Sequence, residues 1–220
     1  MLTKRKFVFG DYDTATSGLW TLTGWSLSEA TPRMTFVDIP GRLDGPLDFT
    51  EAGTGDIQYS SRDLIATFES SEGTRAEREE RIQRMVNLLH GRRTKIWTPD
   101  DAEHFLSGRL KIQKNYNDLV HASITVSATC EPWKFDNEET IVSAELTEEP
   151  QEVTLECSRR AVFPELNVSG ELTLVDRDST YKLTAGTYIL GWLHLRAGEI
   201  RVLQVSGAGS VSFSYRKAVL

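Results

Sequence analysis

The sequence predicts a mainly β protein of the β-sandwich type with a single helix in its N-terminal half. Apolar and polar residues alternate over many short stretches, which is the period of half-buried strands. In the second half, turn-forming residues recur about every 8 to 12 residues, a rhythm typical of small β-sandwiches. Only one segment has the spacing of an amphipathic helix. The 220 residues allow one large domain or two small ones.

The helix is predicted from about residue 75 to residue 90. Thr74 and Glu77 have the spacing of a capping box, in which each side chain bonds the backbone N–H of the other residue. Gly91 supplies a left-handed stop. The apolar face has the spacing i, i+3, i+4, i+7 and consists of Ile82, Met85, Val86 and Leu89. The opposite face is expected to be solvated, and it carries Arg78, Glu79, Arg81 and Arg84.

Two-residue alternation predicts most of the strands. The clearest case runs from Val120 to Cys130, where the even positions are apolar or small and the odd positions are His, Ser or Thr. The other strands predicted in the first half are 6–9, 57–68, 94–97 and 105–112. In the second half the same alternation occurs at 153–157 and 211–215. The first half is therefore predicted to be a sheet-based domain with one packed helix.

Charge places a domain boundary near residue 135. Residues 1–134 carry 17 basic and 19 acidic residues, whereas residues 135–220 carry 8 and 13. Eight of those acids, and no base, lie between Asp136 and Glu156, with Pro150 among them. Like-charge repulsion and a proline favour an exposed, extended connection. The prediction is an N-terminal domain of 1–134 and a C-terminal domain of 135–220, the alternative being an acidic surface strand within one domain.

Composition excludes several classes of protein. The net charge of −7 argues against nucleic-acid recognition, which depends on clustered positive charge. No apolar run approaches the length of a membrane span, and the basic N-terminus does not lead into the apolar core of a secretory signal. We therefore expect a soluble protein with no membrane segment. Cys130 and Cys157 are too few for a disulfide framework and are expected to be buried.

The sequence predicts no catalytic, cofactor-binding or metal site. The four histidines, at positions 90, 104, 121 and 194, have no acid or nucleophile at a recognised spacing. The two glycine pairs at 53–55 and 207–209 lack the remaining residues of a phosphate-binding loop. A hydrolase with two carboxylates far apart in sequence stays open, because such a pair leaves no local signature.

Residues 38–51 form an irregular segment that mixes turn formers with apolar side chains. Pro40 and Pro46 cannot donate to a strand ladder, so the segment cannot be a central strand. Its apolar residues, Ile39, Leu43, Leu47 and Phe49, need a surface to pack on. That surface is either the segment's own domain or a neighbouring subunit.

An ordered set of short motifs resembles the distal tail protein (Dit) family of long-tailed, siphovirus-like phages. The resemblance covers about residues 5 to 134, and each motif alone is weak. In chain order the motifs are Phe7–Gly10, Val37–Arg42, Gly45, Leu47–Glu51, Tyr59, Arg62, Leu64, Phe68, Leu88–Gly91, Gly108–Arg109 and Cys130–Trp133.

The second half is similar in strand-turn pattern to the galectin-like C-terminal domain of the same family. The similar stretches are 181–188, 193–198 and 202–215. A sugar-binding galectin would present a His-x-Asn-x-Arg strand and a Trp-x-x-Glu strand, and neither is present. Sugar binding is therefore not carried over from the resemblance.

The resemblance implies a non-enzymatic structural hub of a phage tail tip or baseplate. It implies a ring, expected to be a homo-hexamer, that joins the tail tube protein, the tape measure protein and the tail-tip protein. The protein would be assembled in the host cytoplasm and located at the virion tail tip. A closed ring needs two different surfaces on each subunit. The residues expected between neighbours are Ile39, Arg42, Leu47 and Phe49, with Tyr59, Arg62 and Arg109 either as their partners or as contacts within the domain.

A carbohydrate-binding module is the alternative function. In that case the C-terminal sandwich would recognise a host surface glycan through aromatic rings stacked on a sugar face. The candidate contacts are Tyr181, Tyr188 and Trp192.

Overall fold

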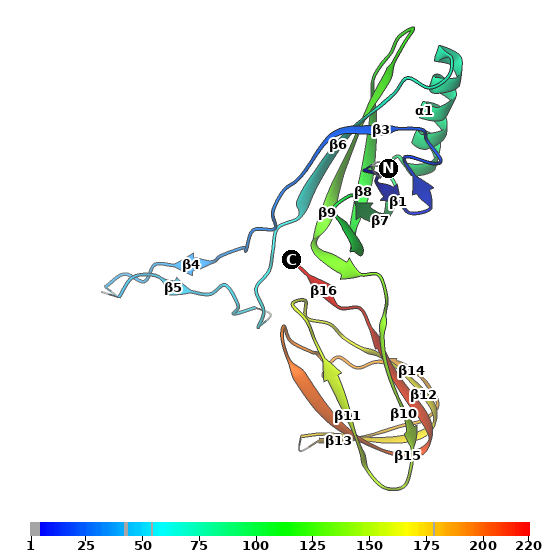
Figure 1. Cartoon of the computed structure of the whole chain (residues 1–220). Coiled ribbons are helices and arrows are strands. Elements are labelled where there is room, and N and C mark those ends of the chain that lie inside the picture. Colours follow the sequence, from blue (N-terminus) through cyan, green and yellow to red (C-terminus); the bar gives the residue numbers. More distant parts are fainter. Residues whose placement is uncertain (1–4, 42–43, 54, 178) are drawn as a thin grey trace. The chain divides into compact units, whose positions relative to one another are not determined.

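A computed structural model describes residues 5–41, 44–53, 55–177 and 179–220. The protein is mainly β with one helix, as predicted (Figure 1). It divides into two compact units, the first comprising residues 1–53 and 57–135 and the second residues 54–56 and 136–220. Each unit has a hydrophobic core of its own.

One antiparallel sheet dominates the first unit. Its strands follow the order β2, β1, β7, β8, β9, β6, β3. They are β1 (Val8–Phe9), β2 (Tyr12–Asp13), β3 (Thr21–Leu27), β6 (Arg62–Ser70), β7 (Arg93–Thr98), β8 (Asp101–Asn117) and β9 (Ala122–Asp136). A separate pair, β4 (Phe36–Val37) and β5 (Leu47–Asp48), lies between β3 and β6 in sequence.

The helix α1 (Arg75–Leu89) begins and ends as predicted. The Thr74 hydroxyl accepts from the Glu77 N–H at 3.3 Å, and the Glu77 carboxylate accepts from the Thr74 N–H at 2.7 Å. Gly91 has a φ of 75° and stops the helix. The prediction that Arg78 is solvated is wrong, because its side chain is buried and donates to the Gly73 and Asp118 carbonyls.

The core of the first unit lies between α1 and one face of the sheet. Ile82, Met85 and Leu89 of the helix are buried against strand side chains. The alternation predicted for 120–130 is confirmed from β9 onwards, since its even positions from Ala122 to Cys130 are buried. Val120 precedes the strand and is 60% exposed, so the strand begins two residues later than predicted.

β3 was not predicted, and the structure shows why its pattern is unclear. A bulge between Leu22 and Gly24 shifts the register against β6. The partly buried positions therefore fall at Leu22, Trp25 and Leu27 and lose the two-residue period.

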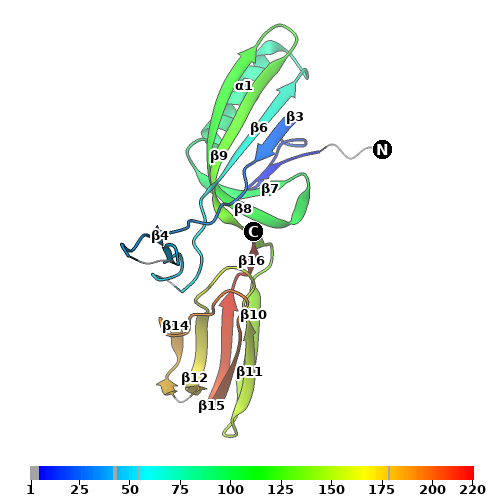
Figure 2. The ribbon, with the colours of Figure 1, turned by 90° about the vertical axis from the view of Figure 1, so that its left-hand side faces the viewer.

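The second unit contains one curled antiparallel sheet, drawn in yellow-green to red in Figure 2. Its strands are β10 (Thr140–Leu146), β11 (Gln151–Glu156), β12 (Glu165–Asp176), β13 (Ser179–Leu183), β14 (Gly186–Ile189) and β15 (Ile200–Tyr215). The prediction of an acidic connection over 136–156 is wrong, because most of that segment forms β10 and β11, both paired with β15. The short β16 (Ala218–Val219) follows β15, and the Ala218 N–H donates to the Ser158 hydroxyl at 3.0 Å.

Glycines allow the two long central strands to change partners. β15 pairs with β11 through Ile200–Val205 and with β10 through Gly209–Tyr215. The backbones of β12 and β15 approach so closely at this change that a Cβ on Gly170, Gly207 or Gly209 would overlap a carbonyl oxygen of the facing strand. All three glycines have a positive φ. The sheet can therefore curl around a single core.

The described part of the chain has no helix that combines the length and the apolar character needed to cross a membrane.

Candidate functional site

The irregular segment predicted over 38–51 belongs to a longer hairpin, residues 30–41 and 44–53, called the arm here. Its central strands β4 and β5 pair only with each other in the described structure. The Phe49 N–H donates to the Thr35 carbonyl at 2.8 Å and continues their ladder. Nearer the sheet, Pro32 forms an isolated bridge with Tyr59. The arm is thus held by backbone pairing and not by a core.

Large apolar side chains on the arm are exposed to solvent. They are Met34 (63%), Phe36 (55%), Val37 (43%), Ile39 (45%) and Phe49 (43%). Val37 lies opposite Leu47, and the ladder continues to Phe49, so Val37, Leu47 and Phe49 share one face. A contiguous apolar surface that its own domain leaves in water is a mark of an interaction site.

The predicted interface residues fall into two groups. Ile39, Leu47 and Phe49 lie on the arm, whereas Arg42 lies outside the described residues.

The second group has partners inside the first unit. Tyr59 packs edge-on against Trp133, with ring centroids 5.3 Å apart. Arg62 is buried, and its Nε donates to the Pro132 carbonyl at 2.8 Å. Arg109 is exposed, and its guanidinium donates to the Gly91 carbonyl at 2.6 Å.

A second exposed apolar feature, missed from the sequence, lies at the turn between β8 and β9. Leu119 is 85% exposed and Val120 is 60% exposed. The Asp118 carboxylate accepts from the Val120 and His121 N–H groups at 2.8 and 2.7 Å. Its carbonyl accepts from Arg78 at 2.9 Å. The turn therefore presents two apolar side chains on a hydrogen-bonded frame.

His104 has an acidic partner that the sequence reading did not anticipate. Its Nδ1 lies 2.9 Å from the Asp101 carboxylate, and Lys134 lies 3.5 Å from the other oxygen. These residues line a cavity of about 150 Å³ at the end of the sheet. Across the described residues, no group of three or more His, Cys, Asp and Glu side chains could hold a metal ion.

The second unit contains a polar pocket of about 360 Å³, called the arginine pocket here. Its lining residues are Arg177, Trp192, His194, Arg196, Glu199 and Arg201. They come from the turn after β12, the loop before β15 and the start of β15.

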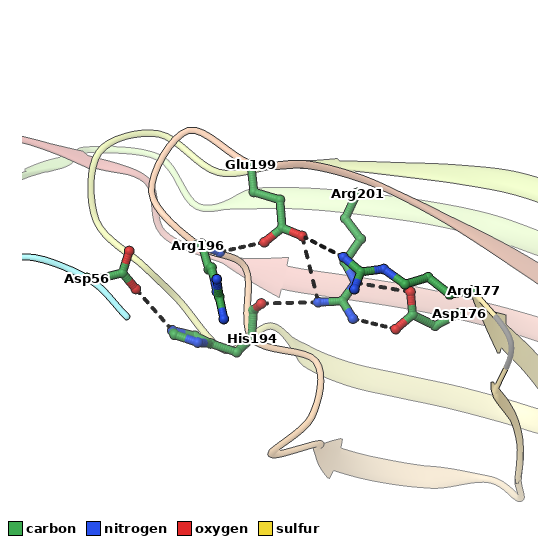
Figure 3. A network of polar contacts seen from close by, with 7 residues as sticks. All are labelled: Asp56, Asp176, Arg177, His194, Arg196, Glu199 and Arg201. Atoms are coloured by element: carbon green, nitrogen blue, oxygen red, sulfur yellow. Dashed lines mark hydrogen bonds and ion pairs between the residues drawn. The ribbon is translucent and has the colours of Figure 1, made fainter. Parts of the chain in front are cut away.

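Arg201 forms the fixed base of the arginine pocket (Figure 3). Its guanidinium forms a two-point pair with Asp176, one contact of which is an Nε–Oδ1 hydrogen bond of 3.2 Å. A third donation reaches the His194 carbonyl at 3.1 Å. Both side chains of the pair are almost fully buried, and the Asp176 hydrogen bond raises the pKa of Arg201. This arginine is therefore committed to structure.

Glu199 stands between the arginines of the pocket (Figure 3). One carboxylate oxygen accepts from the backbone N–H of Arg196 at 2.8 Å. The other lies 3.9 Å from the nearest nitrogens of Arg177 and Arg201. Those contacts are ion pairs and are too long to be hydrogen bonds.

Two ring stacks flank the arginine pocket. Trp192 is stacked on Tyr181, with centroids 3.9 Å apart and planes within 11°. His194 is stacked on Phe163 at 4.5 Å, and its Nε2 lies 4.0 Å from Asp56. Of the three glycan candidates, the structure brings Tyr181 and Trp192 together. Tyr188 is not part of that stack. Its hydroxyl donates to the Thr184 carbonyl at 2.9 Å.

Comparison of the fold with solved structures gives a match over the whole chain. The match is the crystal structure of the SPP1 Dit (gp19.1) protein, with a TM-score of 0.68 over 99% of this chain and 100% of that one. The chain has the Dit fold. The two sequences share 16% identity, and no protein-family model and no curated protein matches the sequence. SPP1 Dit is described as a paradigm of the hub adsorption apparatus in phages that infect Gram-positive bacteria. The Dit fold confirms the resemblance seen in the ordered motifs.

Proposed function

We propose that the protein is a structural hub of a phage tail tip, a homo-hexameric ring without enzymatic activity. The Dit fold over the whole chain supports the tail-hub role, because the neighbour with this fold is itself a hub protein. The partners are the tail tube protein, the tape measure protein and the tail-tip protein. The protein is assembled in the host cytoplasm and resides at the virion tail tip.

The exposed arm is the observation that supports ring formation. Five large apolar side chains between Met34 and Phe49 are exposed. Each such side chain contributes about 1.5 to 3 kcal/mol when it is fully buried, so the arm gains stability from a second surface. In a ring every subunit both presents an arm and receives one, which makes the contact heterologous. Ile39, Leu47 and Phe49 belong to the presented side.

The three other interface candidates have a different role in this proposal. Tyr59 and Arg62 have partners within the first unit and hold the base of the arm. Arg109 is exposed, and donors of its guanidinium other than the one on Gly91 can reach a neighbour. Arg42 lies outside the described residues and stays an interface candidate by its position in sequence alone.

Light scattering on the purified protein tests the ring. The wild type is expected to have about six times the chain mass of 24.7 kDa at micromolar concentration, with a ring visible by negative-stain microscopy. The double variant Ile39→Asp and Phe49→Asp is expected to be a folded monomer, because both side chains are exposed in the single chain.

A matched control tests whether the ring is lost only when the arm is changed, or whenever two exposed apolar side chains are replaced by aspartate. Ile189→Asp with Ile200→Asp removes two isoleucines that are 66% and 67% exposed on the second unit. This control is expected to keep the wild-type mass. A monomeric wild type at high concentration, or a ring in the arm variant, would contradict the proposal.

Glycan recognition by aromatic stacking is the second candidate function. Trp192 lines the arginine pocket and is the observation in its favour. One face of Trp192 and one face of Tyr181 are already used by their mutual stack, which leaves less ring surface for a sugar. Loss of binding to host cell walls in Trp192→Ala, with the hexamer intact, would support this candidate. If the wild type does not bind host cell walls, this candidate function is contradicted.

A further inference from the structure

We propose that the arginine pocket binds the phosphate group of a sugar phosphate or polyol phosphate. This site is separate from the arm and goes beyond the hub role. It is a preformed hollow whose lining is almost entirely polar, with one indole ring. Its charge, its free donors and its rigid frame each point to an anionic ligand.

Charge is the first argument. Three of the eight basic residues of the last 86 residues line this one pocket, although that part of the chain carries 13 acids. Against the three arginines stand the lining carboxylate of Glu199 and the Asp176 carboxylate paired with Arg201, so the formal charge of this group is +1. A phosphate monoester carries about −1.5 to −2 at neutral pH and has three strong acceptor oxygens. The net positive charge of the group attracts such an anion.

Free donors are the second argument. A guanidinium has five N–H donors. Arg201 directs its donors to Asp176 and to the His194 carbonyl. Within the described structure, the guanidinium of Arg196 has no hydrogen-bond partner, and that of Arg177 has only the long ion pair with Glu199. These two forks are therefore available to bind phosphate oxygens, with which guanidinium forms charge-assisted pairs.

The frame around these arginines is the third argument. Glu199 accepts from the Arg196 N–H and so holds the loop that carries this side chain. Leu193 and Leu195 are fully buried, which turns the alternating residues Trp192, His194 and Arg196 toward the pocket. The backbone and the base of the site are thus ordered before a ligand arrives, and the side chains of Arg177 and Arg196 become ordered on binding.

The backbone conformation of Arg177 makes glycine a suitable replacement in a test. Its φ is 53°, in the left-handed region that is unfavourable for a non-glycine residue. Glycine would be preferred here if only the turn mattered. The same backbone angle provides a clean test, because Arg177→Gly removes the guanidinium without straining the turn.

The test is isothermal titration of the full chain with four small molecules: glucose 1-phosphate, glycerol 3-phosphate, glucuronate and glucose. Both phosphate esters are expected to bind, at least tenfold more tightly than glucuronate, and glucose is expected not to bind. Affinity should fall as salt is raised, because the pairing is ionic. The double variant Arg177→Gly with Arg196→Ala should lose at least tenfold in affinity for the esters, with an unchanged or higher melting temperature.

The control is Lys182→Ala, which removes one exposed cation of β13 outside the pocket. This variant should bind the phosphate esters like the wild type. Three outcomes would overturn the proposal: ester binding that survives the double variant, ester binding lost equally in the control, and glucose or glucuronate bound as tightly as the esters. None of these outcomes depends on the hexamer, so the phosphate-binding proposal and the ring proposal are tested independently.

Discussion

Arg78 links two parts of the first unit through one buried side chain. It is 1% exposed and donates to the Gly73 carbonyl at 2.6 Å and to the Asp118 carbonyl at 2.9 Å. It thereby ties the start of α1 to the turn between β8 and β9. Among the described residues no carboxylate forms an ion pair with this buried cation, and two carbonyl oxygens accept from its terminal nitrogens while its Nε has no hydrogen-bond partner.

We expect Arg78→Met to lower the free energy of unfolding by about 3 kcal/mol, because two charge-assisted hydrogen bonds from a buried guanidinium are lost. Chemical denaturation followed by circular dichroism measures this loss. The control is Arg84→Ala, which breaks an exposed i, i+4 pair with Glu80 and should cost less than about 0.5 kcal/mol. Equal effects of the two changes would contradict the role given to Arg78.

Glu79 makes the same region sensitive to acid. Hydrogen bonds from Lys114 and Asn117 lower the pKa of Glu79 from its ordinary value of 4.5 to about 2. A depressed carboxyl pKa stabilises the folded state above the unfolded pKa, and this contribution is lost as pH falls toward the folded one. Glu79→Gln should therefore be less stable than the wild type at pH 7. The difference should shrink between pH 4.5 and about 2, as measured by melting temperature against pH.

At the level of elements, the sheet of the second unit depends on the glycines of β12 and β15. We expect Gly209→Ala to disrupt this sheet, since the new methyl group would overlap the Ser169 carbonyl and the backbone has a φ of 103°. A drop in melting temperature of several degrees, or insoluble protein, would be observed. The control is Gly191→Ala, where a Cβ meets nothing within 4 Å and which should behave like the wild type. A normal melting curve for Gly209→Ala would contradict this account.

The elements that the sequence predicts well are those whose signal is local. The capping box and the 3.6-residue spacing delimit α1, and the long alternation from Ala122 to Cys130 gives β9. β3 was hidden because a bulge breaks its period. The run of acids over residues 136–156 predicts an exposed connection, but in the structure most of this segment pairs with β15 as the strands β10 and β11. Long-range pairing is not visible in a local pattern.

The candidate sites follow the same rule. Proline and apolar residues side by side were enough to single out the arm. Arg177, Glu199 and Arg201 are brought together only by the pairing of strands far apart in sequence, so the arginine pocket was missed. The alternation of Trp192, His194 and Arg196 with two buried leucines was the one local signal available.

At the scale of the whole molecule, the two separate cores predict separate unfolding. Multidomain proteins commonly depart from two-state behaviour. Calorimetry of the wild type is expected to show two transitions, one for each unit. Arg78→Met should lower one transition and Gly209→Ala the other, each leaving the second unchanged. A single transition that both variants shift equally would show that the two cores unfold as one.

The prolines of the arm have a consequence for aggregation. An exposed apolar hairpin with free edges is a template for adding strand after strand, which ends in fibres. Pro32, Pro40 and Pro46 withhold backbone donors along this hairpin, and Pro40 and Pro46 are themselves exposed. Unlimited edge-to-edge growth is thereby blocked, and side-chain contacts of limited extent remain. The same segment can then offer its apolar side chains to one defined partner without growing into a fibre at high protein concentration.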